Sequence, residues 1–161
     1  MEVWHQRNYA QAGLTMTFVQ QSHSRSHRGV LRGLRYQDMT APLGKLVRCT
    51  LGEIFDVAVD LRAGSPTFGA FMSVNLTAEN KRQIYVPPGF AHGFQAVTDV
   101  VEVQYQQTGF YTPAAEGSIA WNDPDIGIPW PIPDPTLSAR DQQARSFKEY
   151  AANPAFRYGR V

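Results

Sequence analysis

The sequence predicts an all-β protein, built as an antiparallel barrel or sandwich in one domain. Short runs of β-branched and aromatic residues recur along the chain, and Gly, Pro, Asp and Asn separate them at short intervals. Regular helical periodicity is scarce. A length of 161 residues, with 43% hydrophobic and 18% charged residues, fits a single domain that has its own core.

The segments expected to form strands are 14–21, 46–51, 53–61, 71–77, 82–87, 93–98 and 100–108. In the segment 53–61, the alternation puts Phe55, Val57 and Val59 on one face and Asp56 and Asp60 on the other. Two aspartates on one strand face need either water or a partner.

The stretch GVLRGLRYQ, residues 29–37, also reads as a strand, yet it carries two permanent positive charges. Arg32 and Arg35 have opposite parity, so a regular strand would point them to opposite faces. Gly33 lies between them and allows a β-bulge. With such a bulge, both arginines could face one cavity.

After residue 109 the chain becomes rich in proline and aspartate. We expect this part to wrap over the barrel as ordered coil, with Trp121 and Trp130 holding it in place. The segment 138–153 predicts one helix, with Ser138 as its N-cap. The domain would then consist of a barrel over about 14–110 and a C-terminal coil and helix over 111–153.

Bulk properties exclude several classes of protein. A formal net charge of +1 argues against nucleic-acid binding driven by phosphate neutralisation. No apolar run approaches the length of a membrane span, and the N-terminus lacks the apolar region of a signal peptide. Cys49 is the single cysteine, so no internal disulfide can form. These features predict a soluble cytoplasmic protein.

The segment YVPPGFAHGF, residues 85–94, holds a Pro-x-Gly-x-x-His unit formed by Pro87, Gly89 and His92. In cupin barrels this unit makes a tight turn and points the histidine into the barrel, whereas a plain hairpin with a structural histidine fits equally well. The chain has four histidines and no His-x-His cluster, which a cupin metal site would need. We therefore expect no metal and no cofactor.

Charged residues also stand among the strand residues of 44–69, namely Lys45, Asp56, Asp60 and Arg62. A charged side chain inside a barrel must be paired or hydrogen-bonded. Lys45 and Arg62 could equally lie on the outer face, because a single bulge reverses the parity of a strand.

Several blocks, in this order and at matching spacing, resemble the dTDP-4-dehydrorhamnose 3,5-epimerases: GVLRGLRYQ, GKLVR, FDVAVDLRAGSPTFG, LTAENKRQIYVPPGFAHGF, GFYTPAAEG, WNDPDIGIPWP and LSARD. The resemblance runs from about the first residue to near residue 145. It implies a cupin-type antiparallel β-barrel (jelly roll) with a C-terminal coil and short helix, and a metal-independent enzyme that forms homodimers.

The resemblance implies inversion of two carbons that flank the C4 ketone of dTDP-4-dehydro-6-deoxy-D-glucose, which gives dTDP-4-dehydro-L-rhamnose. Such a reaction needs a base, a cation for the enolate oxygen, and an acid on the opposite face of the ring. By resemblance, Lys45 holds the enolate oxygen, Tyr111 is the acid, and Asp60 orients the catalytic base. No nucleic-acid or membrane partner is expected.

The resemblance also assigns residues to substrate binding. Arg32 matches the arginine that binds the anionic part of the substrate, and His92 matches a histidine of the substrate pocket. The remaining matches to the binding site are Gln20, Ser22, Glu2 and Arg140. Ser22 and Arg140 replace the asparagine and the lysine that the family usually has.

Two departures bear on activity. The family has its catalytic histidine where this chain has Arg35, and an arginine does not accept a proton in proteins. Arg35 could instead pair with Asp60. The family also has one more strand and turn before the segment EVW, and we expect this N-terminal strand to be missing here.

Three hypotheses follow from the resemblance and these departures. In the first, the chain is a working 3,5-epimerase whose base is replaced by His23, by His92 or by a water held by Asp60, or which keeps partial function from Lys45 and Tyr111 alone. In the second, Arg35 replaces the base, and the chain binds a dTDP-sugar or another anionic ligand without epimerising it, or serves as a structural partner of an active paralogue. In the third, it epimerises only one carbon.

Overall fold

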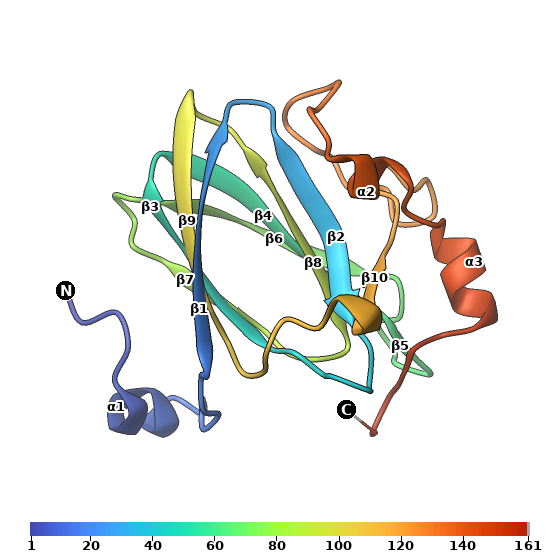
Figure 1. Ribbon diagram of the computed structural model, residues 1–161, viewed down its shortest axis with the longest axis horizontal. Helices are drawn as coiled ribbons and strands as arrows, with labels where there is room; N and C mark the ends of the chain where they lie inside the picture. Colours follow the sequence, from blue (N-terminus) through green and yellow to red (C-terminus); the bar gives the residue numbers. More distant parts are fainter. Residues whose placement is uncertain (161) are drawn as a thin grey trace.

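A computed structural model describes residues 1–160 of the chain. It consists mainly of strands, with short helices near both ends (Figure 1). The strands are β1 (Gln20–His27), β2 (Leu31–Gln37), β3 (Lys45–Leu51), β4 (Glu53–Asp60), β5 (Arg62–Ala63), β6 (Phe71–Thr77), β7 (Gln83–Val86), β8 (Phe90–Ala96), β9 (Val100–Gln107), β10 (Glu116–Ser118) and β11 (Phe156–Arg157). The helices are α1 (Gln6–Gln11), α2 (Ala139–Gln142) and α3 (Phe147–Ala152), with a 3₁₀ turn at Pro113–Ala115.

Two antiparallel sheets form the body of the molecule. One has the strand order β1-β9-β3-β7, and the other has the order β10-β2-β8-β4-β6. Strands that are consecutive in the sequence, such as β3 and β4, lie in different sheets, as in a jelly roll. The predicted fold class, an all-β cupin-type barrel, is confirmed.

Most predicted strands lie within a few residues of the observed ones, and the segment 71–77 coincides with β6. The prediction of a strand over 14–21 is wrong, because the strand there is β1, over Gln20–His27. Its residues are polar, QQSHSRSH, and only their alternating burial marks the strand. A search for β-branched and aromatic residues therefore favoured the apolar run just before it.

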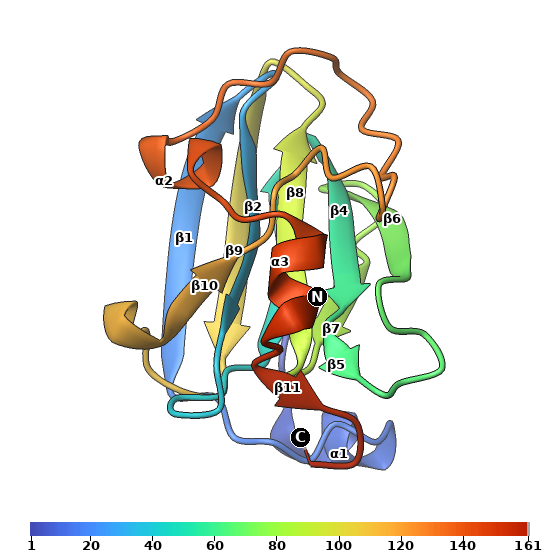
Figure 2. The same ribbon diagram turned by 90° about the vertical axis from the view of Figure 1, so that its right-hand side faces the viewer.

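The hydrophobic core has two layers. One cluster fills the space between the two sheets and includes Val47, Ile54, Leu76, Val101 and Val103. The other covers the opposite face of the five-stranded sheet with the C-terminal segment, so that α3 lies over β8 and β4 (Figure 2). Burial on both faces explains why the last five residues of β4, 56–60, are all buried.

The C-terminal coil packs on the sheet as expected, and its tryptophans take part. Trp130 packs edge-on against Phe55 of β4, with ring centroids 5.7 Å apart. The indole N–H of Trp130 donates to the backbone carbonyl of Trp121 at 2.7 Å. The two tryptophans thus link distant parts of the coil to each other and to the sheet.

The single helix predicted over 138–153 is wrong in its continuity. Ser138 caps α2 as predicted, but that helix ends at Gln142. A second helix, α3, begins after Ser146, whose side chain forms a capping box with Glu149. Between the two helices Arg145 bridges to Ile119, so the local cap and this tertiary contact divide the segment.

The predicted bulge in β2 is present. Arg32 pairs with Phe94 of β8 and Arg35 pairs with His92, and the register shifts between these two pairs. Gly33 has φ +124°, and a Cβ on it would lie 2.5 Å from the Cα of Gly93. Glycine is needed here both for the backbone conformation and for the close approach of β8.

No helix within residues 1–160 is long and apolar enough to cross a membrane.

Candidate active site

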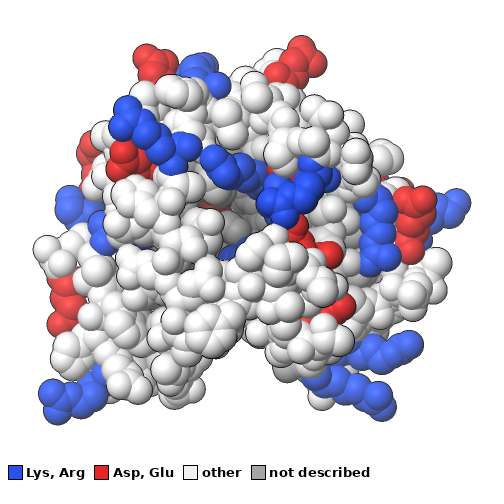
Figure 3. Space-filling model, in the orientation of Figure 1, with Lys and Arg blue, Asp and Glu red and all other residues white. Residues whose placement is uncertain are grey.

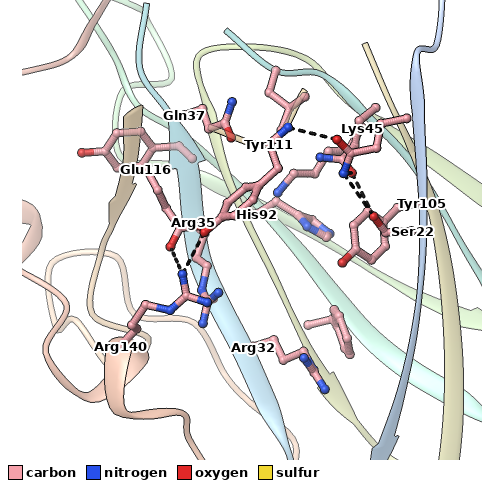
Figure 4. Close-up of a pocket in the computed structure, with 16 residues that line it drawn as sticks. Ser22, Arg32, Arg35, Gln37, Lys45, His92, Tyr105, Tyr111, Glu116 and Arg140 are labelled. Carbon is pink, nitrogen blue, oxygen red and sulfur yellow. Dashed lines mark hydrogen bonds and ion pairs between the residues drawn. The ribbon is translucent and has the colours of Figure 1, made fainter. Parts of the chain in front are cut away.

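A cavity of about 330 Å³ opens between the two sheets at one end of the barrel (Figure 4). The four-stranded sheet supplies Gln20, Ser22, Lys45, Tyr105 and Gln107, and the five-stranded sheet supplies Arg32, Arg35, Gln37, His92, Phe94 and Glu116. Tyr111 and Arg140 complete the mouth from the C-terminal segment. The cavity thus has two walls that carry chemically different side chains.

The charge of this cavity favours an anionic ligand. Its lining includes four cations, Arg32, Arg35, Lys45 and Arg140, and Glu116 is the one carboxylate among the lining residues that the structure describes. Figure 3 shows Lys and Arg side chains gathered at the rim of a hollow near the middle of this face. Guanidinium groups bind phosphate oxygens in a bidentate manner, so a phosphate-bearing ligand fits this lining.

Lys45 lies on β3 and reaches the cavity from the four-stranded sheet. The pKa of its ammonium group is lowered to about 8, mainly by burial; Arg35 acts in the same direction, while Glu116 and Asp56 partly offset both effects. The group therefore remains mostly charged at neutral pH. A desolvated ammonium is well suited to stabilise a developing oxyanion.

His92, on β8, forms a buried pair with Asp56 of β4. The Nε2 atom of His92 lies 3.1 Å and 2.9 Å from the two carboxylate oxygens of Asp56. The histidine side chain is 9% exposed and the aspartate 0%. The turn at Pro87 and Gly89 precedes β8, so this histidine lines the cavity, as the cupin reading of the motif predicted.

Arg35 lines the cavity, but it does not pair with Asp60 as the sequence suggested. Its Nε and NH2 atoms donate to the two carboxylate oxygens of Asp141 at 2.8 and 2.9 Å, and NH2 also donates to Ser138 at 3.0 Å. Asp141 lies in α2 and its side chain is 1% exposed. The partner of position 35 therefore comes from the C-terminal segment and not from β4.

Asp60 lies outside the cavity, which corrects the role expected for it. It accepts hydrogen bonds from the guanidinium and backbone N–H of Arg62 and from the hydroxyls of Ser65 and Thr67. Burial raises its pKa, but these hydrogen bonds outweigh burial and hold the pKa well below its usual range. Asp56 shares its strand face but lies four residues, or roughly 13 Å, nearer the cavity. The same pairs place Arg62 with Asp60 and not at the active site.

Tyr111 stands at the mouth of the cavity and is 42% exposed. Its hydroxyl accepts a hydrogen bond from Arg140 at 2.9 Å, and Arg140 also donates to Glu116 at 2.9 Å. Tyr105 comes from β9, inside the four-stranded sheet, and is partly buried. Of the two phenols, Tyr105 is held on a strand deep in the cavity wall, whereas Tyr111 is tied to the rim.

The predicted binding residues of β1 and β2 reach the cavity. Gln20 donates to the side-chain oxygen of Gln107 at 3.1 Å, and Ser22 donates to the same oxygen at 3.2 Å. The side chain of Gln20 also accepts from the backbone N–H of Tyr111 at 3.1 Å. Arg32 is exposed at the cavity mouth, where it donates to the hydroxyl of Ser26 at 3.1 Å and to the backbone carbonyl of Arg25 at 3.4 Å.

Two predicted residues lie elsewhere. Glu2 is exposed and accepts a hydrogen bond from Asn8 at 2.9 Å, within the N-terminal segment. His23 is 48% exposed and pairs with Glu102 on the outer side of β1 and β9. Neither residue lines the cavity.

Within residues 1–160, His, Cys, Asp and Glu side chains form no group of three or more that could hold a metal ion. The absence of a metal and of a cofactor from the reaction stays a prediction.

Sequence reasoning missed several residues that line the cavity, among them Tyr105, Gln107 and Glu116, and it also missed Asp141 as the partner of Arg35. Tyr105 and Gln107 continue the alternation of Val101 and Val103, which face the core. This alternation could have predicted that Tyr105 and Gln107 of β9 point to the inside of the barrel. Asp141 stands in the block LSARD, but nothing local in the sequence connects it with a residue 106 positions earlier.

Comparisons with known proteins agree with this geometry. The family model described as dTDP-4-dehydrorhamnose 3,5-epimerase matches residues 1–149. A protein of that name from Pseudomonas aeruginosa is 53% identical over 150 residues, which is 92% of this chain and 82% of the relative.

Solved structures give the same result. A dTDP-6-deoxy-D-glucose-3,5-epimerase from Legionella pneumophila, in complex with dTDP-4-keto-L-rhamnose, matches with a TM-score of 0.92 and 44% identity, over 98% of this chain and 84% of that one. A 3′-monoepimerase from Streptomyces bikiniensis, in complex with dTDP-quinovose, matches with a TM-score of 0.89 and 35% identity, over 94% and 77%. By sequence and by structure, this chain belongs to the dTDP-4-dehydrorhamnose 3,5-epimerase family.

Proposed function

We propose that the protein converts dTDP-4-dehydro-6-deoxy-D-glucose to dTDP-4-dehydro-L-rhamnose by removing and returning protons next to the C4 ketone. One observation carries the proposal: the cavity brings a desolvated cation, Lys45, together with a buried imidazole on one wall and a phenol on the other. The curated relative from Pseudomonas aeruginosa is named for this reaction, which supports the assignment.

The ammonium of Lys45 explains how a proton next to the ketone becomes acidic enough to be removed. A proton next to a ketone leaves readily only when the negative charge on the enolate oxygen is stabilised. The ammonium of Lys45 is desolvated, and the charged residues that line its cavity are mainly cations. We place the ketone oxygen of the sugar against this group.

The residues at the rim of the cavity are suited to bind the dTDP part of the substrate. Arg32 and Arg140 are exposed at the mouth, and Gln20, Ser22 and Gln107 form a polar network on the neighbouring wall. Arginines bind diphosphates through charge-assisted hydrogen bonds, and amide and hydroxyl groups provide neutral contacts. The diphosphate then lies at the rim, and the sugar points toward Lys45.

The acid on the opposite face of the sugar is better provided by Tyr105 than by Tyr111. Tyr105 comes from the four-stranded sheet and His92 from the five-stranded sheet, so the two side chains approach the cavity from opposite walls. Inversion needs this arrangement, because the proton must return on the face opposite to the one it left. Tyr111 remains at the rim, where it contacts Arg140.

The presence of Arg35 at the position of the expected base raised a second reading, in which the protein binds a dTDP-sugar without epimerising it. The comparisons do not support that reading, since relatives at 53% and 55% identity are named as epimerases. The number of carbons inverted is a separate question, because a structure of similar fold belongs to a 3′-monoepimerase.

The proposal is tested by mixing the purified protein with dTDP-4-dehydro-6-deoxy-D-glucose and following the sugar by NMR. We expect product with both C3 and C5 inverted, and inversion at C3 alone would indicate a monoepimerase. Binding of dTDP, measured by calorimetry, serves as the control for an intact site. Binding without any product would contradict the proposal.

Two further expectations remain predictions. The resemblance implies a homodimer, and the edge position of β1 in its sheet leaves a strand available for pairing with a second copy. Sedimentation analysis would measure the oligomeric state. The expected cytoplasmic location also stays a prediction.

A further inference from the structure

The position that should hold the base is permanently occupied by a cation in this chain. Arg35 donates two hydrogen bonds to Asp141 and one to Ser138. A guanidinium does not release its proton near neutral pH, so it cannot take one from a substrate. If the enzyme is active as proposed, another group must remove the proton.

The histidines of the chain narrow the choice, because three of the four lie away from the cavity. His5 caps α1, His23 pairs with Glu102 on the surface, and His27 is exposed at the end of β1. His92 alone among them lines the cavity. Its backbone pairs directly with Arg35 across β2 and β8, so its ring stands beside the position that Arg35 occupies.

The surroundings of His92 prepare it to accept a proton. Both oxygens of Asp56 contact its Nε2 atom, at 3.1 and 2.9 Å. Because an ionised carboxylate only accepts hydrogen bonds, the Nε2 that faces Asp56 is the donor, and in the neutral imidazole Nδ1 is then the nitrogen that can accept a proton. Asp56 is completely buried, so its charge is held next to the imidazolium that proton transfer would create.

Lys45 is the other basic group in the cavity, and its charge state argues for a different role. Its pKa of about 8 leaves most of the group protonated at neutral pH. A protonated lysine stabilises an enolate but cannot take the proton that forms it. His92 and Lys45 therefore suit complementary tasks, and Figure 4 shows both among the side chains that line the pocket.

We propose that His92, held by Asp56, is the general base of this enzyme, in place of the residue that Arg35 replaces. The proposal rests on the proposed epimerase activity. His92 Nδ1 takes the proton from the carbon next to the ketone, and the electron pair of the C–H bond forms the enolate, whose oxygen faces Lys45. Tyr105 then gives its phenolic proton to the same carbon from the opposite wall. The imidazolium afterwards loses its proton to solvent, and the phenolate takes one up.

The test follows deuterium entering C3 and C5 of the substrate in D₂O, for the wild type and for His92→Gln. We expect the exchange rate of His92→Gln to fall by about 10²–10⁴-fold, the usual contribution of a general base. His23→Gln is the matched control, because it removes a histidine that also pairs with a carboxylate but lies outside the cavity. It should exchange like the wild type.

A second variant separates proton transfer from a structural effect. His92→Gly leaves space for a free imidazole, so added imidazole should restore exchange in proportion to its concentration. Loss in His92→Gln without rescue of His92→Gly would give His92 a positioning role and overturn the proposal. Undiminished exchange in His92→Gln would also overturn it and leave the epimerase function standing.

Failure of the proposed function gives a different pattern. In that case the wild type binds dTDP but shows no exchange and no product, so no variant can have a lower exchange rate than the wild type. Binding of dTDP by each variant, measured in the same buffer, confirms that its site has folded.

Discussion

Lys45 is the residue whose charge the proposed chemistry requires most directly. Burial lowers its pKa to about 8, and the neighbouring Arg35 acts in the same direction. The charged form, which stabilises the enolate, is therefore present below this pH and is lost as the pH rises through it. The pH dependence of turnover thus reports the role of this single group.

We predict that kcat/KM, which reports the free enzyme, falls as the pH rises through about 8. Lys45→Arg stays charged at alkaline pH, so its kcat/KM should not fall through pH 8. Its overall rate should still be lower than that of the wild type, because the geometry of a guanidinium differs from that of an ammonium. Lys45→Met should lose about 10²–10³-fold below pH 8, as on removal of an oxyanion donor, and its deficit relative to the wild type should shrink at higher pH. A rate that climbs through pH 8 would instead make neutral Lys45 the base.

The two tyrosines of the cavity offer a second comparison between residues. Tyr105→Phe should reduce turnover by about 10²–10⁴-fold, because it removes the proton donor of the second step. Tyr111→Phe removes only an exposed hydrogen bond to Arg140, with an expected cost of about 1 kcal/mol in substrate affinity. Steady-state kinetics of both variants measure the difference. A larger loss of kcat in Tyr111→Phe would return the acid role to Tyr111.

Individual residues show which features of the site could be predicted from the sequence and which could not. The bulge at Gly33 was predictable, and it brings Arg32 and Arg35 to one cavity. Asp56 and Asp60 share a strand face, so alternation could not tell which one serves the site. The position of each aspartate along β4 determines which of them serves the site. This could not be predicted from the sequence, because it depends on where the cavity opens in three dimensions.

At the scale of elements, the ion pair of Arg35 and Asp141 joins β2 to α2. Arg35 is 24% exposed and Asp141 is 1% exposed, so the carboxylate depends on this partner. Sequence patterns could not show this contact, because it links a strand of the barrel to a short helix at the far end of the chain. The same segment was also expected to be one helix, although Ser146 begins a second one.

We predict that Arg35→Met lowers the free energy of unfolding by about 3–5 kcal/mol, because it leaves a buried charge unpaired. Adding Asp141→Asn should recover part of this loss, which a double-mutant cycle in urea would measure as a coupling energy. The surface pair of Arg25 and Glu102 is the control, since Arg25 is 63% exposed and its coupling should stay below about 1 kcal/mol. Additive effects at Arg35 and Asp141 would contradict the account.

The loop after β4 has its own anchor in Asp60. Asp60→Asn should destabilise the protein by about 1.5–3 kcal/mol at neutral pH, because it weakens charged hydrogen bonds to Arg62. The depressed pKa means that this stability is present above the unfolded pKa near 4 and is lost only as the pH falls through the lower folded value. Urea titrations at several pH values would measure it.

Turnover of Asp60→Asn is the matching control, because Asp60 does not line the cavity. We expect kcat close to that of the wild type wherever the variant is folded. A loss of kcat comparable to that of His92→Gln would restore Asp60 to the catalytic site.

For the whole molecule, the arrangement of the two sheets explains why this fold suits an epimerase. Each wall of the cavity belongs to a different sheet, so the groups that we propose to take and give a proton, His92 and Tyr105, face the cavity from opposite sides. The C-terminal segment covers the outer face of one sheet, supplies Arg140 to the cavity lining, and holds Arg35 through Asp141. The fold class followed from strand patterns, whereas the cavity required the packing of segments that are distant in sequence.

The central claim is that this cavity removes a proton next to the ketone although Arg35 occupies the expected position of the base. Deuterium wash-in from D₂O into dTDP-4-dehydro-6-deoxy-D-glucose, followed by NMR with the wild-type protein, tests it most directly. The account predicts exchange at C3 and C5 at a rate well above that without enzyme. Intact dTDP binding with no exchange at either carbon would contradict it.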